Sequence, residues 1–448
     1  MVKASLKKVF IKNFKSLHDC EIDIGKMNVV VGSNASGKSN LVEVFRLLKK
    51  IYVDKDPFPF LEWWGYNNVV WQKKEELPIS IGLLFDIEGY EAYFETNFSG
   101  AGGNFQILRE VLDIRRHVKF EKKGEWVTIQ NNVEFINDVI ESPQKYNVSS
   151  EGKKIINKQK NDLIKGFKDK WILEEKLLDI FKEFQKIKEI SPTEYDIVDK
   201  KIPKILYEYL GNWEILSPVV HCRKDGHFEN ISIYVVAFEI IYYTINKLLI
   251  LYPLNIRLMK SPQSLRREEA LKEDGTNIAS VYHSIYLKEG KIPDEIHIPF
   301  GMVFPKTNVR PHITDDGRVM IKFFEDGLEL LPPNTSDGFY KILTMLIAIY
   351  LKPPLLIVDE IENSLHPSTL ELILDTIKKG DNQAIITTHS PVVVDMTELN
   401  DIILVEKEQG ESKFKRIKDP DKIREFLIEK GITFSEGWIY GDLLKTEQ

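Results

Sequence analysis

Apolar and polar residues alternate near the start of the chain, and the pattern then changes to a helical spacing. Residues 7–14, 20–25 and 27–32 have the alternating or continuously apolar character of β-strands. Residues 41–52 (LVEVFRLLKKIY) place apolar side chains three and four positions apart, which favours a helix. The pattern therefore predicts a strand, a loop and a helix around residues 32–40.

Further apolar segments between about residues 77 and 130 indicate antiparallel hairpins. Turn-forming sequences such as EG, SGAGG and KKG separate residues 78–87, 90–98, 105–114 and 125–130. We interpret residues 1–145 as an N-terminal lobe that combines the loop at 32–40 with an antiparallel β-lobe.

Residues 146–255 are interpreted as a helical insertion. Lys and Glu are mixed with apolar residues at every third or fourth position across 162–187, as in exposed amphipathic helices. The most apolar run, 231–252, is interrupted by Glu239 and Lys247, and charges near a bilayer centre are costly. We expect a buried helix there and no membrane span.

The remaining residues, 256–448, are predicted to form a C-terminal lobe of alternating helices and strands. A helix is expected from about residue 337, and the apolar stretches 354–360 and 383–390 have the character of buried strands. A further strand is expected at 401–408. The alternation predicts an α/β fold.

Composition limits the classes of partner and compartment. The formal net charge of −7 argues against a protein that coats nucleic acid over its whole surface, although a local basic groove stays compatible with it. The chain has only two cysteines, Cys20 and Cys222, and its N-terminal residues lack an apolar signal core. We expect a cytoplasmic protein.

A phosphate-binding loop follows the strand at 27–32. The sequence GSNASGKS fits the pattern G-x-x-x-x-G-K-[ST], in which backbone N–H groups and a helix start surround phosphate oxygens. Lys38 would reach the β- and γ-phosphates of a nucleotide, and Ser39 would offer its hydroxyl to Mg²⁺. The predicted nucleotide-binding residues are Gly32, Ser33, Asn34, Ala35, Ser36, Gly37, Lys38, Ser39 and Asn40.

Two later strands are expected to bring chemistry to this loop. Asp359 and Glu360 follow an apolar strand, and ligands of parallel sheets gather at such strand ends. Asp359 would hold Mg²⁺, while Glu360 would orient and deprotonate the attacking water. His389 ends the next strand, where an imidazole could hydrogen-bond the γ-phosphate or the water.

These sites, together with NTSDGFYK at 334–341, resemble the ABC-type ATPase heads of the SMC, RecF-like and overcoming-lysogenisation-defect (OLD) families. The predicted AAA-type ATPases grouped with OLD proteins are the nearest of these in pattern. The other stretches that carry the resemblance are IKNFKSL at 11–17, DGTNIASVY at 274–282, DEIENSLHP at 359–367, TTHSP at 387–391 and GWIYGDLL at 437–444.

The resemblance implies a P-loop ATPase head with Walker A and Walker B motifs, which dimerises by sandwiching ATP and Mg²⁺. Ser336, Asp337 and Gly338 would then contact the γ-phosphate bound by the partner protomer, and residues 363–366 would take the D-loop position. Two departures from the pattern are Ile361 in place of proline and residues 339–341 in place of threonine-leucine-arginine. A homodimer or higher oligomer is implied, in a prokaryotic defence or DNA-maintenance setting that includes antiphage defence and DNA repair.

Other functions stay open at this stage. One is a nucleotide-gated scaffold that recruits a separately encoded nuclease or toxin effector; another is a transporter's nucleotide-binding subunit. DNA is a candidate partner. The Toprim nuclease domain of OLD-type nucleases is not expected, because the residues after His389 predict only a hairpin and a helix.

Three further patterns are interpreted as structural. Residues 99–103 (SGAGG) lie between two predicted strands and are expected to be a turn rather than a dinucleotide loop. His221, Cys222 and His227 are too loosely spaced for a metal site. The aromatic stretch 58–71 could stack bases or dock a partner, but core packing is favoured.

Overall fold

The computed structural model describes residues 4–115, 118–123, 126–131, 172–173, 219–224, 227–363 and 365–439. Its contacts divide the chain into two compact units, Met1–Asp23 with Leu47–Asn246, and Ile24–Arg46 with Lys247–Gln448. The phosphate-binding loop thus groups with the C-terminal part of the chain, whereas the division into 1–145, 146–255 and 256–448 stays a prediction.

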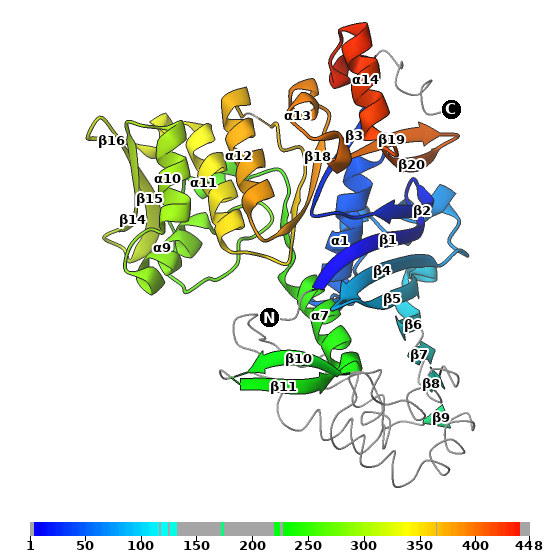
Figure 1. The fold of residues 1–448 in the computed structure, drawn as a ribbon. Helices are drawn as coiled ribbons and strands as arrows, with labels where there is room; N and C mark the ends of the chain where they lie inside the picture. Colours follow the sequence, from blue (N-terminus) through cyan, green and yellow to red (C-terminus); the bar gives the residue numbers. More distant parts are fainter. Residues whose placement is uncertain are drawn as a thin grey trace. The chain divides into compact units, whose positions relative to one another are not determined.

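The first unit contains an eight-stranded antiparallel sheet (Figure 1), in the order β2-β1-β4-β5-β6-β7-β8-β9. In β1 buried residues such as Val9 and Ile11 lie two positions apart, so that they share one face of the sheet and pack into its core. The hairpins expected between about 77 and 130 are confirmed. The strands are β1 (Ala4–Phe14), β2 (Leu17–Asp23), β4 (Ile79–Ile87), β5 (Tyr90–Ser99), β6 (Gln106–Ile114), β7 (Val118–Lys123), β8 (Trp126–Asn131) and β9 (Ile172–Leu173).

The turn expected at 99–103 is confirmed, because a short 3₁₀ segment, Ala101–Gly103, links β5 to β6. In the aromatic stretch, Phe60, Tyr66 and Trp71 are buried, whereas Phe58 and Trp64 are exposed. Core packing therefore accounts for only part of this stretch.

Most of the predicted helical insertion lies outside the described residues. The described parts are the strand β9, the hairpin of β10 (Val219–Lys224) and β11 (His227–Ser232), helix α7 (Ile233–Lys247) and strand β12 (Leu249–Leu251). The run 231–252 thus comprises the end of β11, a helix and a short strand, where a single helix was expected. Among the described helices, none is both long enough and apolar enough to cross a bilayer.

The second unit is built on a six-stranded sheet in the order β12-β17-β18-β3-β19-β20. Strands β12 to β19 are parallel, and β20 pairs with β19 in an antiparallel hairpin. Strands β3 and β17 are buried along their whole length, as expected for a parallel sheet covered on both faces. The new strands are β3 (Met27–Gly32), β17 (Leu355–Val358), β18 (Gln383–Thr388), β19 (Ile402–Glu408) and β20 (Glu411–Arg416).

Helices flank this sheet. Helices α11 and α12 pack against each other (Figure 1), and the first is buried over most of its length because apolar residues recur through it. The helices are α1 (Lys38–Tyr52), α11 (Asp337–Tyr350), α12 (Pro367–Lys379), α13 (Pro391–Asp395), α14 (Pro420–Lys430) and α15 (Phe434–Ile439). The predicted α/β fold class, with an antiparallel β-lobe, is confirmed.

A smaller antiparallel sheet belongs to the same unit and packs on α9. Its core includes Phe323, which contacts the aromatic ring of Phe339 on α11. This contact ties the start of α11 to the sheet. The elements are α8 (Ile256–Met259), β13 (Gln263–Ser264), α9 (Ile278–Glu289), α10 (Asp294–Val303), β14 (Thr307–Ile313), β15 (Arg318–Glu325) and β16 (Leu328–Leu330).

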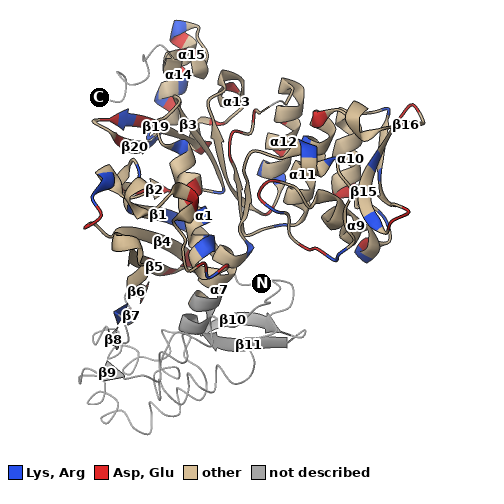
Figure 2. Ribbon diagram, turned by 180° about the vertical axis from the view of Figure 1, so that it is seen from behind, with Lys and Arg blue, Asp and Glu red and all other residues tan. Residues whose placement is uncertain are grey.

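Charged residues of both signs are interspersed along α14, β19 and β20 (Figure 2). Lys415 on β20, for example, pairs with Glu406 and Glu408 across the hairpin. Such mixing of signs produces no single-sign field on these elements.

Candidate active site

The loop between β3 and α1 has a backbone that requires glycine at fixed points. A Cβ at Gly32 would lie 2.5 Å from the carbonyl oxygen of Val405 and 2.6 Å from Ser36 Oγ. Gly37 has a φ of 110°, and Ala35 adopts a φ of 63° in the left-handed region. The loop is therefore a tight turn that leads from a buried strand into a helix start.

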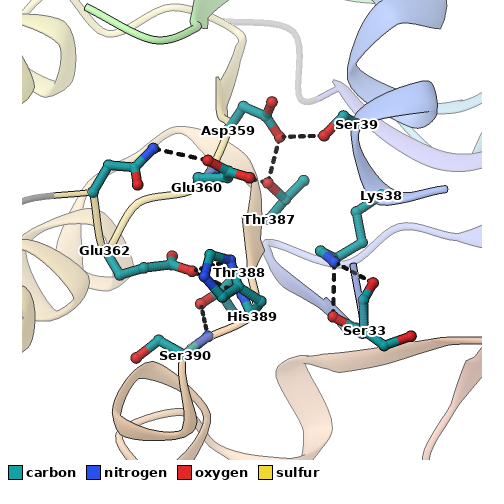
Figure 3. Close-up of polar contacts among 12 residues, drawn as sticks. Ser33, Lys38, Ser39, Asp359, Glu360, Glu362, Thr387, Thr388, His389 and Ser390 are labelled. Atoms are coloured by element: carbon teal, nitrogen blue, oxygen red, sulfur yellow. Dashed lines mark hydrogen bonds and ion pairs between the residues drawn. The ribbon is translucent and has the colours of Figure 1, made fainter. Parts of the chain in front are cut away.

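Lys38 turns back over this loop. Its Nζ donates hydrogen bonds to the carbonyl oxygens of Gly32 (2.7 Å) and Ser33 (2.9 Å), and the residue is only 7% exposed. Burial lowers the pKa of Lys38, and the negative charges of Glu360, Glu362 and Asp359 act in the opposite direction. The three carboxylates thus act on the ammonium group through their charge, whereas its hydrogen bonds go to the loop carbonyls (Figure 3).

Asp359 follows β17 and meets Ser39 from the first turn of α1. Ser39 Oγ donates to Asp359 Oδ1 over 3.3 Å, and Thr387 Oγ1 donates to the same oxygen over 2.5 Å. Burial raises the pKa of Asp359, while these two hydrogen bonds act to lower it. Sequence reasoning missed Thr387. Its place on β18 beside the end of β17 follows from the register in which Val358 pairs with Ile386.

Glu360 occupies a strained position directly after Asp359. Its φ of 51° lies in the left-handed region, which a non-glycine residue rarely adopts. Its backbone N–H donates to Thr387 Oγ1 (2.9 Å), and its Oε2 accepts from Asn363 Nδ2 (2.9 Å). These bonds at its two ends fix the direction of the carboxylate.

His389 stands at the end of β18 with a carboxylate that sequence reasoning did not single out. Oε1 of Glu362 accepts a hydrogen bond from the backbone N–H of His389 (2.8 Å) and lies 2.9 Å from Nδ1 of its ring. Figure 3 shows the two side chains facing each other. The sequence signal that could have identified this partner is Glu362 itself, an acidic residue two positions after Glu360.

The segment 334–341 forms the start of α11. Ser336 caps this helix, and its Oγ accepts from the N–H of Gly338 (3.2 Å), as a preferred N-cap residue does. Lys260 Nζ donates to the carbonyl oxygen of Thr335 (2.7 Å) and pairs with Asp337 Oδ1 (2.8 Å). Ser336 and Asp337 are exposed, so the helix start is presented to solvent.

The arrangement fits a nucleoside triphosphate with Mg²⁺. A carboxylate and a hydroxyl, from Asp359 and Ser39, are oxygen ligands of the kind that Mg²⁺ prefers. Ser36 Oγ is buried and has no hydrogen-bond partner among the described residues, so a donor in the loop is left for a ligand. The side chains of His221, Cys222 and His227 lie outside the described set, and the described side chains form no three-residue metal cluster.

Comparison with known proteins gives two family matches. A model described as "AAA ATPase domain" matches residues 5–285. A second, described as "AAA domain, putative AbiEii toxin, Type IV TA system", matches residues 244–395. No curated protein sequence matches the chain.

Several solved structures of Smc head domains are similar in fold. One, bound to the C-terminal domain of ScpA and derived from Pyrococcus furiosus, is 14% identical with a TM-score of 0.47, covering 95% of this chain and 99% of that one. Another, from Pyrococcus yayanosii, is 12% identical with a TM-score of 0.45 and coverages of 96% and 100%. A third, from Thermotoga maritima, is 14% identical with a TM-score of 0.37 and coverages of 92% and 99%.

Proposed function

The chain belongs to the AAA ATPase domain family, and we propose that it binds ATP with Mg²⁺ and hydrolyses it to ADP and phosphate. The observation that carries this proposal is the meeting of Ser39 with Asp359, next to the buried ammonium group of Lys38. A hydroxyl and a carboxylate that can hold Mg²⁺, together with a lysine that can bind phosphate, are the groups that phosphoryl transfer requires.

ATP binding would use groups of the loop and of the start of α1. The backbone N–H groups at the start of α1 and the Oγ of Ser36 would donate to phosphate oxygens. Lys38 Nζ would exchange its two carbonyl acceptors for oxygens of the β- and γ-phosphates. The exchange places a phosphate charge beside a buried ammonium group, which is otherwise costly to keep charged.

Hydrolysis would use Glu360 as general base. Its carboxylate, held by Asn363, would take a proton from water as the water oxygen bonds to the γ-phosphorus and the bond to the ADP oxygen breaks. Ser39 and Asp359 would hold Mg²⁺, which supplies charge neutralisation to the phosphates when bound. His389 would contact the γ-phosphate or the water.

We further propose that ATP joins two protomers. Ser336, Asp337 and Gly338 stand at an exposed helix start, where the hydroxyl and the positive end of the helix dipole favour an anion. In the dimer these residues would complete the phosphate site of the partner protomer, and hydrolysis would release it. Lys260 would hold the segment in place through Thr335 and Asp337.

The biological setting proposed is prokaryotic defence or DNA maintenance, with the chain as a sensor or motor subunit. The family model that matches residues 244–395 is described as a putative AbiEii toxin of a type IV TA system, and this description supports a defence setting. The alternative function is a scaffold that recruits a separately encoded effector. It would differ from a sensor or motor subunit by slow ATP turnover together with ATP-dependent capture of that effector.

The test compares wild type with Glu360→Gln by size-exclusion chromatography with light scattering, with and without ATP and Mg²⁺. Loss of the base should block hydrolysis and trap the ATP-bound state, so only the variant should accumulate a stable dimer. Adding Ser336→Arg to this variant should return it to monomers, because the larger side chain occupies the anion site.

Glu371→Gln is the matched control, since Glu371 is exposed on α12 and should behave as wild type. If wild type shows no Mg²⁺-dependent ATPase activity, the proposed reaction is wrong. If wild type has ATPase activity but the mass of Glu360→Gln does not change when ATP is added, only the dimer mechanism is wrong.

A further inference from the structure

Glu362 is an acidic residue beside the reaction site to which the preceding mechanism gives no role. It lies in the turn after β17. Its Oε1 accepts a hydrogen bond from the backbone N–H of His389 and lies 2.9 Å from Nδ1 of the ring (Figure 3). The side chain of Glu362 is only 11% exposed, whereas that of His389 is 44% exposed. A mostly buried carboxylate thus contacts an imidazole that extends toward solvent.

The contact bears on which ring nitrogen carries a proton. Because an ionised carboxylate has no proton of its own to offer, the 2.9 Å separation of Oε1 from Nδ1 favours the ring forms that carry a proton on Nδ1. Nε2 is then the ring atom left to interact with a ligand. A carboxylate that fixes the tautomer and direction of a functional histidine is a common arrangement in metal and acyl-transfer sites.

The backbone keeps the two partners in register. The N–H groups of Glu360 and Ile361 both bond to Thr387, through its Oγ1 (2.9 Å) and its carbonyl oxygen (3.3 Å). The turn that carries Glu362 is therefore attached to the strand end that carries His389. Glu362 also acts electrostatically on Lys38, which places its charge near the phosphate-binding lysine.

We propose that Glu362 is a positioning residue for ATP hydrolysis, which orients His389 so that Nε2 faces the γ-phosphate. The inference deepens the proposed function and rests on it. Glu362 contacts neither the nucleotide nor the water in this proposal, so its main effect on the hydrolysis step passes through His389. Its loss should therefore lower kcat far more than it changes the KM for ATP.

The experiment measures kcat and KM for Mg²⁺-ATP in the full chain. Glu362→Ala should lower kcat roughly 10- to 100-fold, the range typical of residues that orient a functional histidine. Glu362→Gln should lose less, because its amide oxygen can still accept from the backbone N–H of His389 and lie beside Nδ1 of its ring. Glu371→Ala, on the exposed face of α12, serves as the control and should match wild type.

The double variant Glu362→Ala/His389→Ala separates positioning from a general structural role. If Glu362 acts through His389, the double variant should be no slower than His389→Ala alone. Independent, multiplied losses would overturn the inference. Should Glu362→Ala fail to fold, Glu362→Asp replaces it, because the shorter side chain keeps the charge but draws it away from the ring.

The outcomes distinguish this inference from the proposed function. If wild type does not hydrolyse ATP, the proposed function fails first. If wild type is active and His389→Ala is slow while Glu362→Ala turns over normally, the positioning role alone is refuted. Equal losses in Glu362→Gln and Glu362→Ala would also refute it, since the acceptor would then be irrelevant.

Discussion

Replacing Lys38 with alanine tests how the loop binds a triphosphate. Lys38 Nζ donates to two carbonyl oxygens of its own loop, and the residue is almost fully buried. Burial lowers its pKa, so the free protein holds the ammonium group at a cost that a bound phosphate would relieve. We expect Lys38→Ala to lose ATP affinity while retaining the fold.

The size of the loss follows from the bonds exchanged. Hydrogen bonds to charged groups contribute about 1.5–3 kcal/mol each, but two existing bonds to Gly32 and Ser33 must be given up. Relief of the buried charge adds to the gain, so we take a net of about 2–4 kcal/mol. At about 1.4 kcal/mol for each tenfold change, Kd should rise roughly 30- to 700-fold.

The assay is a fluorescence titration with a labelled ATP analogue in the presence of Mg²⁺, with thermal unfolding as a check of the fold. The loss should be large for ATP and small for AMP, because Lys38 is expected to contact only the β- and γ-phosphates. Lys288→Ala, an exposed lysine on α9, is the control. A folded Lys38→Ala protein whose Kd for ATP equals that of wild type would refute the reasoning.

Two further predictions concern the loop and the β-lobe. Gly32→Ala should abolish ATP binding and lower the melting temperature, because its Cβ would lie 2.5 Å from the carbonyl oxygen of Val405, whereas Gly301→Ala, with no atom within 4 Å of its Cβ, should match wild type. Similar melting temperatures and affinities for both variants would contradict this. Hydrogen bonds led by that from Arg109 lower the pKa of Glu121 from 4.5 to about 2, so its ion pairs should stabilise the fold above pH 4.5 and cease to do so as the pH falls through about 2. The difference in unfolding free energy between wild type and Glu121→Gln should be about 1 kcal/mol near neutral pH and vanish in acid, and a difference independent of pH would contradict the assignment.

Short-range patterns were enough to predict several elements. The strand, loop and helix at 27–52 follow from a buried apolar run, a glycine-rich turn and a helical spacing, all of which act over a few residues. The hairpins of the β-lobe follow from the same kind of local signal, alternation interrupted by turn residues. The pairs Asp359–Glu360 and His389–Ser390 could likewise be placed at strand ends from apolar runs alone.

Other features could not be read from local pattern. The grouping of the loop with the C-terminal part of the chain depends on parallel pairing of β3 with β18 and β19. The hairpin of β10 and β11 lies in a region whose composition predicted helices. Pairing between distant strands outweighs local preference when it satisfies backbone groups and buries apolar side chains.

Motifs in the chain specify which chemical groups the site contains: a phosphate loop, a lysine, a hydroxyl, two acids and a histidine. Which of these groups meet depends on the fold, because Ser39 and Asp359 are 320 positions apart and are brought together by strand order and register. The same register places Thr387 beside Asp359 and brings Glu362 into contact with His389. The physical reason is that motifs specify side chains over short stretches, whereas hydrogen-bond pairing between distant strands sets the distances at which those side chains act.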